Sequence, residues 1–377
     1  MKTFITQLES YYKCLMTDCP ANCCRYWKIE VSNDIYQNYT KLTGLHGIII
    51  RSCIKGHGPG IIRRVFGRCP FLIEGGLCRF QKDNGDIALL PLVCKQYPFH
   101  VMDLGYRQEI TILLSCPAAA ATFDDHPYDI NLVPTEKKYQ PYYTANNDDK
   151  EFLSELLLQR DIALSAICEP SHSLPSLFQA IYACAGRSNS LYLSNSTRVK
   201  ARDIHLSFDP DDWGSYIVSK EPSNAFYPIE LVDRIILDLV YYTSMSLRNP
   251  HLFVLIQKYK KLFGRLDQHS AKKWLDDRLE ELYKADPSFE DRHRCYFAHT
   301  LQQLYPYAYE SYFWQRQAML AILYTELLEI FDITEFISYN RVPDKKERVL
   351  TLSALERGTR HNPALTENIF NLIRKEF

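Results

Sequence analysis

The sequence predicts a mainly α-helical protein, in which an irregular, cysteine-rich, metal-binding N-terminal module (residues 1–125) packs on a C-terminal α-helical domain (residues 126–377). Two observations lead to this prediction. Nine of the twelve cysteines lie in the first 116 of the 377 residues. Apolar residues recur at helical intervals of three and four only after about residue 150. A chain of this length exceeds the size at which single cores stop growing, which favours two packed domains.

The predicted N-terminal module consists of short segments that glycine and proline interrupt, such as "IKGHGPG" and "RCPFLIEGGLC". Segments with so few buried apolar residues need a further source of folding energy, which a metal ligated by cysteine thiolates supplies. We therefore expect the clustered cysteines to bind metal.

Helices dominate the second part of the sequence. Pro228 suits the first turn of a helix, and an apolar stripe follows it. The segment "ESYFWQRQAMLAILYTELLEIF" is apolar around most of its circumference, which predicts a buried central helix. Pro343 and Gly358 bracket a further predicted helix, with proline at its start and glycine past its end.

Composition indicates which partners and compartments to expect. Hydrophobic residues make up 46% of the chain, charged residues 24%, and the formal net charge is -1. Such a balance gives no electrostatic attraction to nucleic acid or to an anionic membrane. The start "MKTFITQLES" lacks the apolar run of a secretory signal, and no window approaches the length of a transmembrane segment. We expect a cytoplasmic protein, whose thiols are kept reduced and serve as metal ligands or reactive groups.

The cysteine spacing defines two groups of four candidate metal ligands. Thiolates are soft ligands that suit zinc or an iron–sulfur cluster, and the absence of paired CxxC knuckles favours the cluster over zinc. Adjacent side chains diverge, so one of the doublet at 23 and 24 is expected to bind while the other packs or serves a second site. The scattered Cys168, Cys184 and Cys295 are expected to be small buried hydrophobes. The candidate ligands are Cys14, Cys19, Cys23 and Cys24, followed by Cys69, Cys78, Cys94 and Cys116.

Several motifs together carry a resemblance to a known family. The run "CLMTDCPANCCRYWKIEV", then "CPFL", "LCRF", "CKQYPF" and "LLSCP", is similar to the cysteine-rich half of the flagellin lysine-N-methylase (FliB) family. The later segments "FAHTLQQLYPYAYESYFWQRQAMLAILYTELLEI" and "LSALERGTRHNPALTENIF" resemble that family's helical half. The resemblance spans nearly the whole chain, and it is weakest between residues 120 and 225.

The resemblance implies an activity and its cofactors. It implies a protein lysine N-methyltransferase that transfers a methyl group from S-adenosylmethionine to lysines of flagellin, or of another surface protein, with a [4Fe–4S] cluster. The eight cysteines above become its candidate ligands, of which such a cluster needs four. The resemblance identifies no catalytic residue and no S-adenosylmethionine-binding residue, and it leaves the oligomeric state open.

The residues alone do not indicate methylation. No glycine-rich loop follows a predicted strand, so a doubly wound cofactor-binding sheet is not expected. The radical-enzyme pattern Cx3Cx2C also fails, because Tyr26 stands at its third position. Two alternatives therefore stay open: a non-catalytic zinc- or iron-chelating binding module, and a redox protein.

Two helical motifs also have alternative interpretations. The aromatic run "YPYAYESYFW" lines a substrate pocket or belongs to the core, and the burial preference of aromatic residues favours the core. His361 and Asn362 are pocket groups or the cap of the last helix. Asparagine before Pro363 favours the cap.

Overall fold

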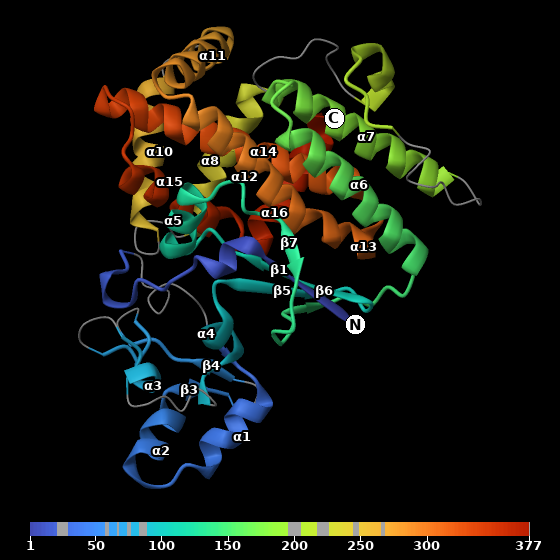
Figure 1. The fold of residues 1–377 in the computed structure, drawn as a ribbon. Coiled ribbons are helices and arrows are strands. Elements are labelled where there is room, and N and C mark those ends of the chain that lie inside the picture. The colour runs from blue at the N-terminus through green and yellow to red at the C-terminus, as the bar shows by residue number, and fades with distance from the viewer. Residues whose placement is uncertain are drawn as a thin grey trace.

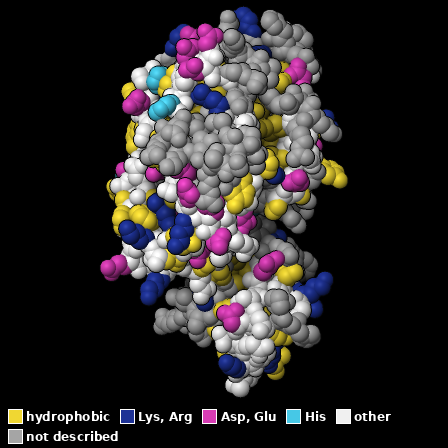
Figure 2. Space-filling view, turned by 90° about the vertical axis from the view of Figure 1, so that its right-hand side faces the viewer, with side chains coloured by type: hydrophobic (Ala, Val, Ile, Leu, Met, Phe, Trp, Pro, Cys, Tyr) yellow, Lys and Arg dark blue, Asp and Glu magenta, His cyan; other side chains and the backbone are white. Residues whose placement is uncertain are grey.

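The computed structural model describes residues 1–20, 29–56, 60–65, 68–73, 77–82, 89–194, 205–216, 226–243, 249–264 and 268–376. Helices make up most of these residues, which confirms the predicted mainly α fold class. Figure 1 shows a large helical body above a small lobe, with a β-sheet between them. The space-filling view in Figure 2 shows the same division between a broad upper part and a narrower lower part.

The N-terminal third alternates short helices with short strands (Figure 1). Its elements are β1 (Lys2–Thr6), η1 (Gln7–Ser10), η2 (Met16–Asp18), β2 (Glu30–Val31), α1 (Asn33–Lys41), α2 (Gly44–Ser52), β3 (Ile54–Lys55), β4 (Gly60–Ile62), α3 (Arg79–Lys82), α4 (Leu92–Gln96), β5 (Phe99–Asp103), β6 (Arg107–Ile112), α5 (Pro117–Asp125), β7 (Leu132–Pro134) and β8 (Tyr143–Thr144).

The remaining elements are helical. They are α6 (Lys150–Cys168), α7 (Leu174–Ser194), η6 (Pro210–Tyr216), α8 (Ile229–Thr243), α10 (Pro250–Phe263), α11 (Gln268–Ala285), α12 (Ser288–Leu304), η7 (Tyr305–Tyr307), α13 (Ala308–Ser311), α14 (Trp314–Tyr339), α15 (Lys345–Thr359) and α16 (Pro363–Glu376). None of the described helices is long and apolar enough to cross a membrane.

Helix α14 is the buried central helix that the sequence predicts. Its residues from Ala321 to Glu335 are all buried, including polar ones. Helices α7, α10, α11, α12 and α15 contact it. A helix surrounded in this way must be apolar on nearly every face, which is the pattern in the sequence.

A five-stranded mixed sheet, which the sequence did not predict, lies beneath the helical body in Figure 1. The strand order is β7-β1-β6-β5-β8. β1 pairs with β6 in parallel, with Lys2 opposite Arg107 and Ile5 opposite Ile110. β5 pairs with β6 in antiparallel fashion, with Phe99 opposite Ile112. Residues that follow β1, follow β6 or precede β5 therefore meet at one edge of the sheet.

The small lobe is formed by the described residues between 29 and 94. It contains α1, α2, α3 and a three-stranded sheet of order β2-β4-β3. The described residues of the lobe include twelve buried ones that form an apolar core separate from the main core. Sheet residues such as Leu104 and Ile112, together with α5, pack into the main core instead. The predicted domain boundary, residue 125, is the last residue of α5 and stays a prediction.

Candidate functional site

Three of the predicted ligands lie at the sheet edge where β1 and β6 end. Cys14 and Cys19 follow β1 and η1, and Cys116 is the N-cap residue of α5, whose first residue is Pro117. The Tyr12 hydroxyl lies 3.9 Å from Cys116 Sγ. Burial raises the pKa of Tyr12, and the nearby Cys116 and Cys14 thiols raise it further. Cys14 and Cys116 thus lie near Tyr12, and Cys19 lies near Cys116. Cys23 and Cys24 lie outside the described residues.

A second set of thiols lies in the small lobe. Cys69 is a buried member of its core, and Cys53, Cys78 and Cys94 pack against that core. Burial raises the pKa of Cys69 to about 11, and the neighbouring Cys78 and Cys53 also raise it. Burial raises the pKa of Tyr39 as well, as do Cys94, Cys69 and Cys78. Cys53 was not among the predicted ligands.

The structure therefore groups the cysteines differently from the sequence spacing. Cys116 lies with Cys14 and Cys19, whereas Cys69, Cys78 and Cys94 lie together in the other core. The donor chemistry of each set fits a soft metal, since the donors are thiols in largely apolar surroundings. Among the described residues, however, no three His, Cys, Asp or Glu side chains are already placed to hold a metal ion. The metal centre stays a prediction.

Ser115 organises a polar network beside Cys116. Its fully buried hydroxyl lies 2.8 Å from His361 Nε2 and 3.2 Å from the Tyr97 hydroxyl. Its carbonyl oxygen accepts a hydrogen bond of 2.9 Å from Arg357 Nη2. We call the site formed by Tyr97, Ser115, Cys116, His361 and His100 the junction, because it joins the sheet to the helical body.

The two junction histidines are neutral at pH 7. Burial among protein groups lowers the pKa of His361 to about 3, and Arg360, Arg357 and His100 contribute. Burial lowers the pKa of His100 to about 4, with a smaller effect of Arg360. His361 is nevertheless exposed to solvent, whereas Ser115 is not. His361 is therefore the solvent-accessible end of this network.

The helical body holds the junction from the other side. The Tyr307 hydroxyl lies 3.1 Å from His100 Nε2. Arg360 donates a 2.9 Å hydrogen bond to Gln303, which in turn donates one of 2.8 Å to the carbonyl of Ile112 at the end of β6. Segments from four distant parts of the chain thus meet here: "CKQYPF", "LLSCP", "FAHTLQQLYPY" and "RGTRHNP".

The contacts around the junction decide between the alternative interpretations of His361 and Asn362 and of the aromatic run. Asn362 Oδ1 accepts a hydrogen bond of 3.1 Å from the Leu365 amide, which confirms its role as the cap of α16. His361, one residue earlier, points to Ser115 instead. In the aromatic run, Tyr305 and Trp314 are buried, which confirms that these residues belong to the core.

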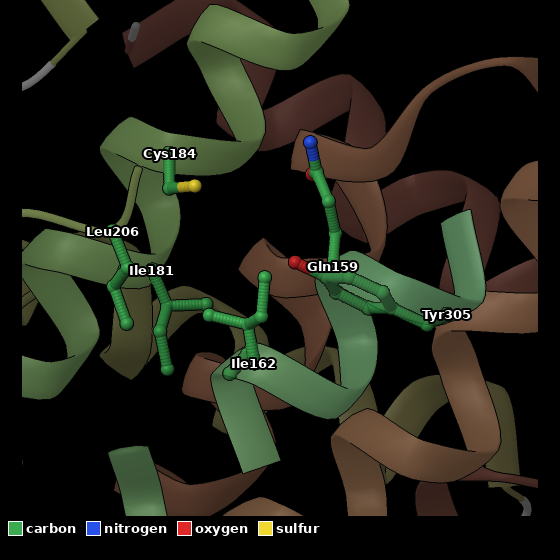
Figure 3. A pocket seen from close by; sticks show the side chains of 7 residues that line it. Gln159, Ile162, Ile181, Cys184, Leu206 and Tyr305 are labelled. Carbon is green, nitrogen blue, oxygen red and sulfur yellow. The ribbon is translucent and has the colours of Figure 1, made fainter. Parts of the chain in front are cut away.

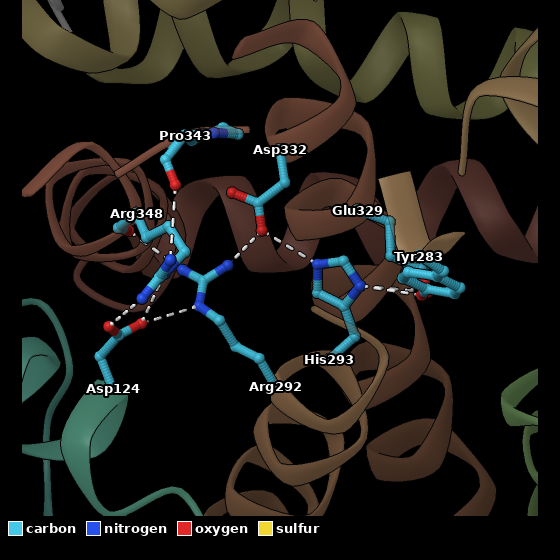
Figure 4. Close-up of polar contacts among 8 residues, drawn as sticks. All are labelled: Asp124, Tyr283, Arg292, His293, Glu329, Asp332, Pro343 and Arg348. Atoms are coloured by element: carbon cyan, nitrogen blue, oxygen red, sulfur yellow. Dashed lines mark hydrogen bonds and ion pairs between the residues drawn. The ribbon is translucent and has the colours of Figure 1, made fainter. Parts of the chain in front are cut away.

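A second buried network fastens α5 to three helices (Figure 4). Arg348 and Arg292 both pair with Asp124 of α5, at 2.9 Å and 3.3 Å. Arg292 also pairs with Asp332 of α14, which accepts a 2.9 Å hydrogen bond from His293 Nε2. Two arginines and two aspartates balance their charges in the core, so this network holds Cys116 at the start of α5 in a fixed place.

The same network continues to the buried carboxyl group of Glu329. The Tyr283 hydroxyl lies 2.9 Å from His293 Nδ1 and donates a 3.2 Å hydrogen bond to Glu329 (Figure 4). Burial raises the pKa of Glu329 well above its usual value, and the charges of Glu326 and Asp332 raise it further. No described contact links these groups to solvent-reachable His361, so we assign the network a structural role.

A small apolar pocket lies between α6 and α7 (Figure 3). It is lined by Gln159, Ile162, Ala163, Ile181, Cys184, Leu206 and Tyr305. Its cavity volume of about 10 Å³ has room for about one water molecule. Burial raises the pKa of Cys184 to about 11, so its thiol stays protonated at neutral pH. The pocket is too small to hold a nucleoside cofactor.

The chain is similar to curated proteins of Salmonella. It is 27% identical over 148 residues to the lysine-N-methylase of Salmonella choleraesuis, which covers 36% of each chain. It is 27% identical over 146 residues to the lysine-N-methylase of Salmonella typhimurium, covering 36% of this chain and 35% of that protein. The flagellar biosynthetic protein FliU of Salmonella muenchen is 26% identical over 130 residues, 31% of this chain and 74% of that protein.

The match spans about a third of the length of the two lysine-N-methylases. No protein-family model and no solved structure matches the chain significantly. Distant, partial relatives of this kind confirm the resemblance to the flagellin lysine-N-methylase family over about a third of the chain, not over nearly all of it as the motifs had indicated.

Proposed function

We propose that the protein is a protein lysine N-methyltransferase that uses S-adenosylmethionine, with flagellin or a similar surface protein as the methyl acceptor. The observation that supports the proposal most is the convergence of the four family-like segments on one solvent-reachable site. Tyr97 and His361 lie 264 positions apart in the sequence and both contact Ser115, which is unexpected if the motifs served only the core. The junction is the proposed active site.

The charges at the junction suit a lysine substrate. A lysine ε-amine accepts a methyl group only after losing its proton, because its lone pair must attack the methyl carbon of the sulfonium. Arg357 and Arg360 are positive charges beside the junction, and such neighbours lower the pKa of an approaching amine. Neutral His361 is a hydrogen-bonding group at this site, and the proton that the amine releases passes to solvent, because an imidazole with a pKa of about 3 is too weak a base to hold it. The chain's own residues thus favour the reactive form of the substrate.

The thiols beside the junction are the proposed cluster ligands. Cys14, Cys19 and Cys116 come from the set around Tyr12, and the sequence adds Cys23 and Cys24. These donors would hold a [4Fe–4S] cluster, which supplies one-electron chemistry when bound. A zinc ion held by the same thiols is the alternative.

A methylation assay on anaerobically purified protein tests the proposal. Purified flagellin and S-adenosylmethionine are incubated with the wild type, and methylated lysines are counted by mass spectrometry. We expect methylation by the wild type and by Cys168→Ala, whose thiol lies outside both cysteine sets and is exposed, not buried as its sequence context had predicted. His361→Ala should reduce the rate by about 10²-fold, the order of effect expected when a positioning contact beside the reacting groups is lost. Equal rates for His361→Ala and Cys168→Ala would remove the junction as the active site.

A further inference from the structure

The side chain of Arg360 is partly buried and has no ionic partner among the described residues. Arg360 follows the last residue of α15 and directly precedes His361 of the junction. Its Nη2 donates a 2.9 Å hydrogen bond to the side chain of Gln303, which is a neutral amide. A guanidinium stays charged at physiological pH and has five N–H donors, of which Gln303 engages one. An anion bound to Arg360 would supply the missing counter-charge.

The acidic residue one turn earlier on α15 does not supply that charge. Glu356 lies four positions before Arg360, a spacing at which opposite charges often pair on a helix. The side chain of Glu356 is buried instead, and its carboxylate accepts a 2.7 Å hydrogen bond from the Tyr296 hydroxyl. Burial raises the pKa of Glu356, although Arg360 opposes the increase. The packing of the core thus directs Glu356 to Tyr296 and leaves Arg360 without an ion pair.

The end of the helix alone does not explain the position of Arg360. The helix dipole favours cations near a C-terminus, and Arg357 in the last turn of α15 is another such cation. A side chain that served only the dipole could extend into solvent. Arg360 turns instead to Gln303, which donates a 2.8 Å hydrogen bond to the Ile112 carbonyl at the end of β6. Gln303 therefore holds the guanidinium at the edge of the sheet, beside the junction.

The charge of Arg360 reaches the groups that form the junction. Burial lowers the pKa of His100 and of His361, and Arg360 lowers both further. Arg360 also opposes the increase that burial causes in the pKa of Tyr307, whose hydroxyl contacts His100. An anion bound to Arg360 would therefore lie beside His361, the solvent-accessible end of the junction network.

The proposed methyl donor has a group that suits this guanidinium. S-adenosylmethionine carries its negative charge on the carboxylate of its methionine part, whereas its ammonium and sulfonium groups are positive and its adenosine part is neutral. A planar guanidinium binds a carboxylate through two parallel hydrogen bonds. On the basis of the proposed function, we propose that Arg360 binds the carboxylate of S-adenosylmethionine and so fixes the methionine part of the methyl donor at the junction. Arg360 is then a cofactor-binding residue and takes no part in the transfer of the methyl group.

Binding of S-adenosylmethionine and of its decarboxylated form tests the proposal. The two compounds differ only in the carboxylate, and isothermal titration calorimetry on anaerobically purified protein measures their dissociation constants. Arg360→Gln should weaken binding of S-adenosylmethionine by about tenfold to a hundredfold, the usual effect of losing hydrogen bonds between charged groups. It should leave binding of the decarboxylated form unchanged, which would also show that the variant is folded. Equal affinities of the wild type and Arg360→Gln for S-adenosylmethionine would overturn the proposal.

Two further variants separate the charge of Arg360 from its geometry. Arg360→Lys keeps the positive charge but loses the paired hydrogen bonds, so it should recover only part of the affinity for S-adenosylmethionine. Lys346→Gln removes an exposed cation near the start of the same helix and should leave both dissociation constants unchanged. An equal loss of affinity for both compounds in Arg360→Gln would mean that Arg360 supports the fold and not the carboxylate, which would contradict the proposal.

The same titrations distinguish this proposal from the proposed function. If the wild type does not bind S-adenosylmethionine at all, the proposed methyl donor is wrong and the assignment of Arg360 fails with it. If the wild type binds S-adenosylmethionine and Arg360→Gln binds it equally well, only the assignment of Arg360 is wrong. Weaker binding of flagellin to Arg360→Gln, with unchanged binding of S-adenosylmethionine, would assign the anion to the acceptor protein and would also overturn the proposal.

Discussion

Glu326 in α14 should make the protein less stable at alkaline pH. Its side chain is 4% exposed, and its carboxylate accepts hydrogen bonds from the backbone amides of Phe226 and Tyr227. Burial raises the pKa of Glu326 from 4.5 to about 8, although the two amides and Lys272 oppose the increase. The folded protein therefore keeps a proton on Glu326 at pH values at which the unfolded chain has lost it.

The sign and size of the effect follow from this difference. Because the folded state binds more protons between pH 4.5 and about 8, the free energy of unfolding falls as pH rises through that range. At about 1.4 kcal/mol for each pH unit, the free energy of unfolding falls by about 5 kcal/mol over this range. For a chain of 377 residues, this corresponds to a decrease of about 6 °C in melting temperature.

Thermal unfolding of Glu326→Gln from pH 5 to pH 8.5 measures the contribution. Glutamine resembles the protonated acid and can still accept from Phe226. We expect the variant to match the wild type at pH 5 and to melt about 6 °C higher at pH 8.5, by the same relation. Glu136→Gln, at an exposed glutamate, is the control with no expected pH-dependent difference. A difference between Glu326→Gln and the wild type that stays constant with pH would refute the reasoning.

Two further changes test other parts of the fold by chemical denaturation. Glu109→Leu should lower the free energy of unfolding by about 3–5 kcal/mol, because it leaves the Arg160 guanidinium buried without its 2.7 Å partner. Adding Arg160→Met should recover most of that loss, and a double variant as unstable as Glu109→Leu would contradict this explanation. Asp344→Ala removes the capping box that begins α15 and should cost about 1 kcal/mol, whereas an unchanged midpoint would show that the cap contributes nothing.

The helical half of the fold could be predicted because its signals are local. The apolar segment that predicts a central helix is α14, and Pro228 directly precedes α8. One helix end that was predicted from a glycine was wrong. Gly358 was expected past the end of a helix but lies inside α15, where a side-chain carbon would come within 2.4 Å of Leu252. The absence of a side chain at Gly358 lets α15 pack closely against Leu252 of α10. Spacing along the sequence cannot reveal such a contact.

The sheet was missed because its pairing is not local. β1 and β6 are separated by about a hundred residues, since Lys2 pairs with Arg107. β6 is a central strand with most of its residues buried, including Gln108 and Glu109. Its sequence, RQEITI, alternates polar and apolar residues only over the last four positions, which is too short a stretch to mark a buried central strand. Because β6 has polar residues at buried positions, its sequence did not identify it as a strand, although β6 positions the junction.

The parallel pairing of β1 with β6 decides which cysteines can act together. Chain segments that leave the ends of two parallel strands emerge at the same edge of a sheet. Cys14 follows β1 and Cys116 follows β6, so the fold brings them together across about a hundred intervening residues. Spacing had instead joined Cys116 to Cys94, its neighbour in sequence, although β5 and β6 lie between them. Ser115, next to Cys116, meets His361 at the same edge. One strand pairing thus accounts for both the regrouped thiols and the proposed active site, and a variant that disrupts it should affect both.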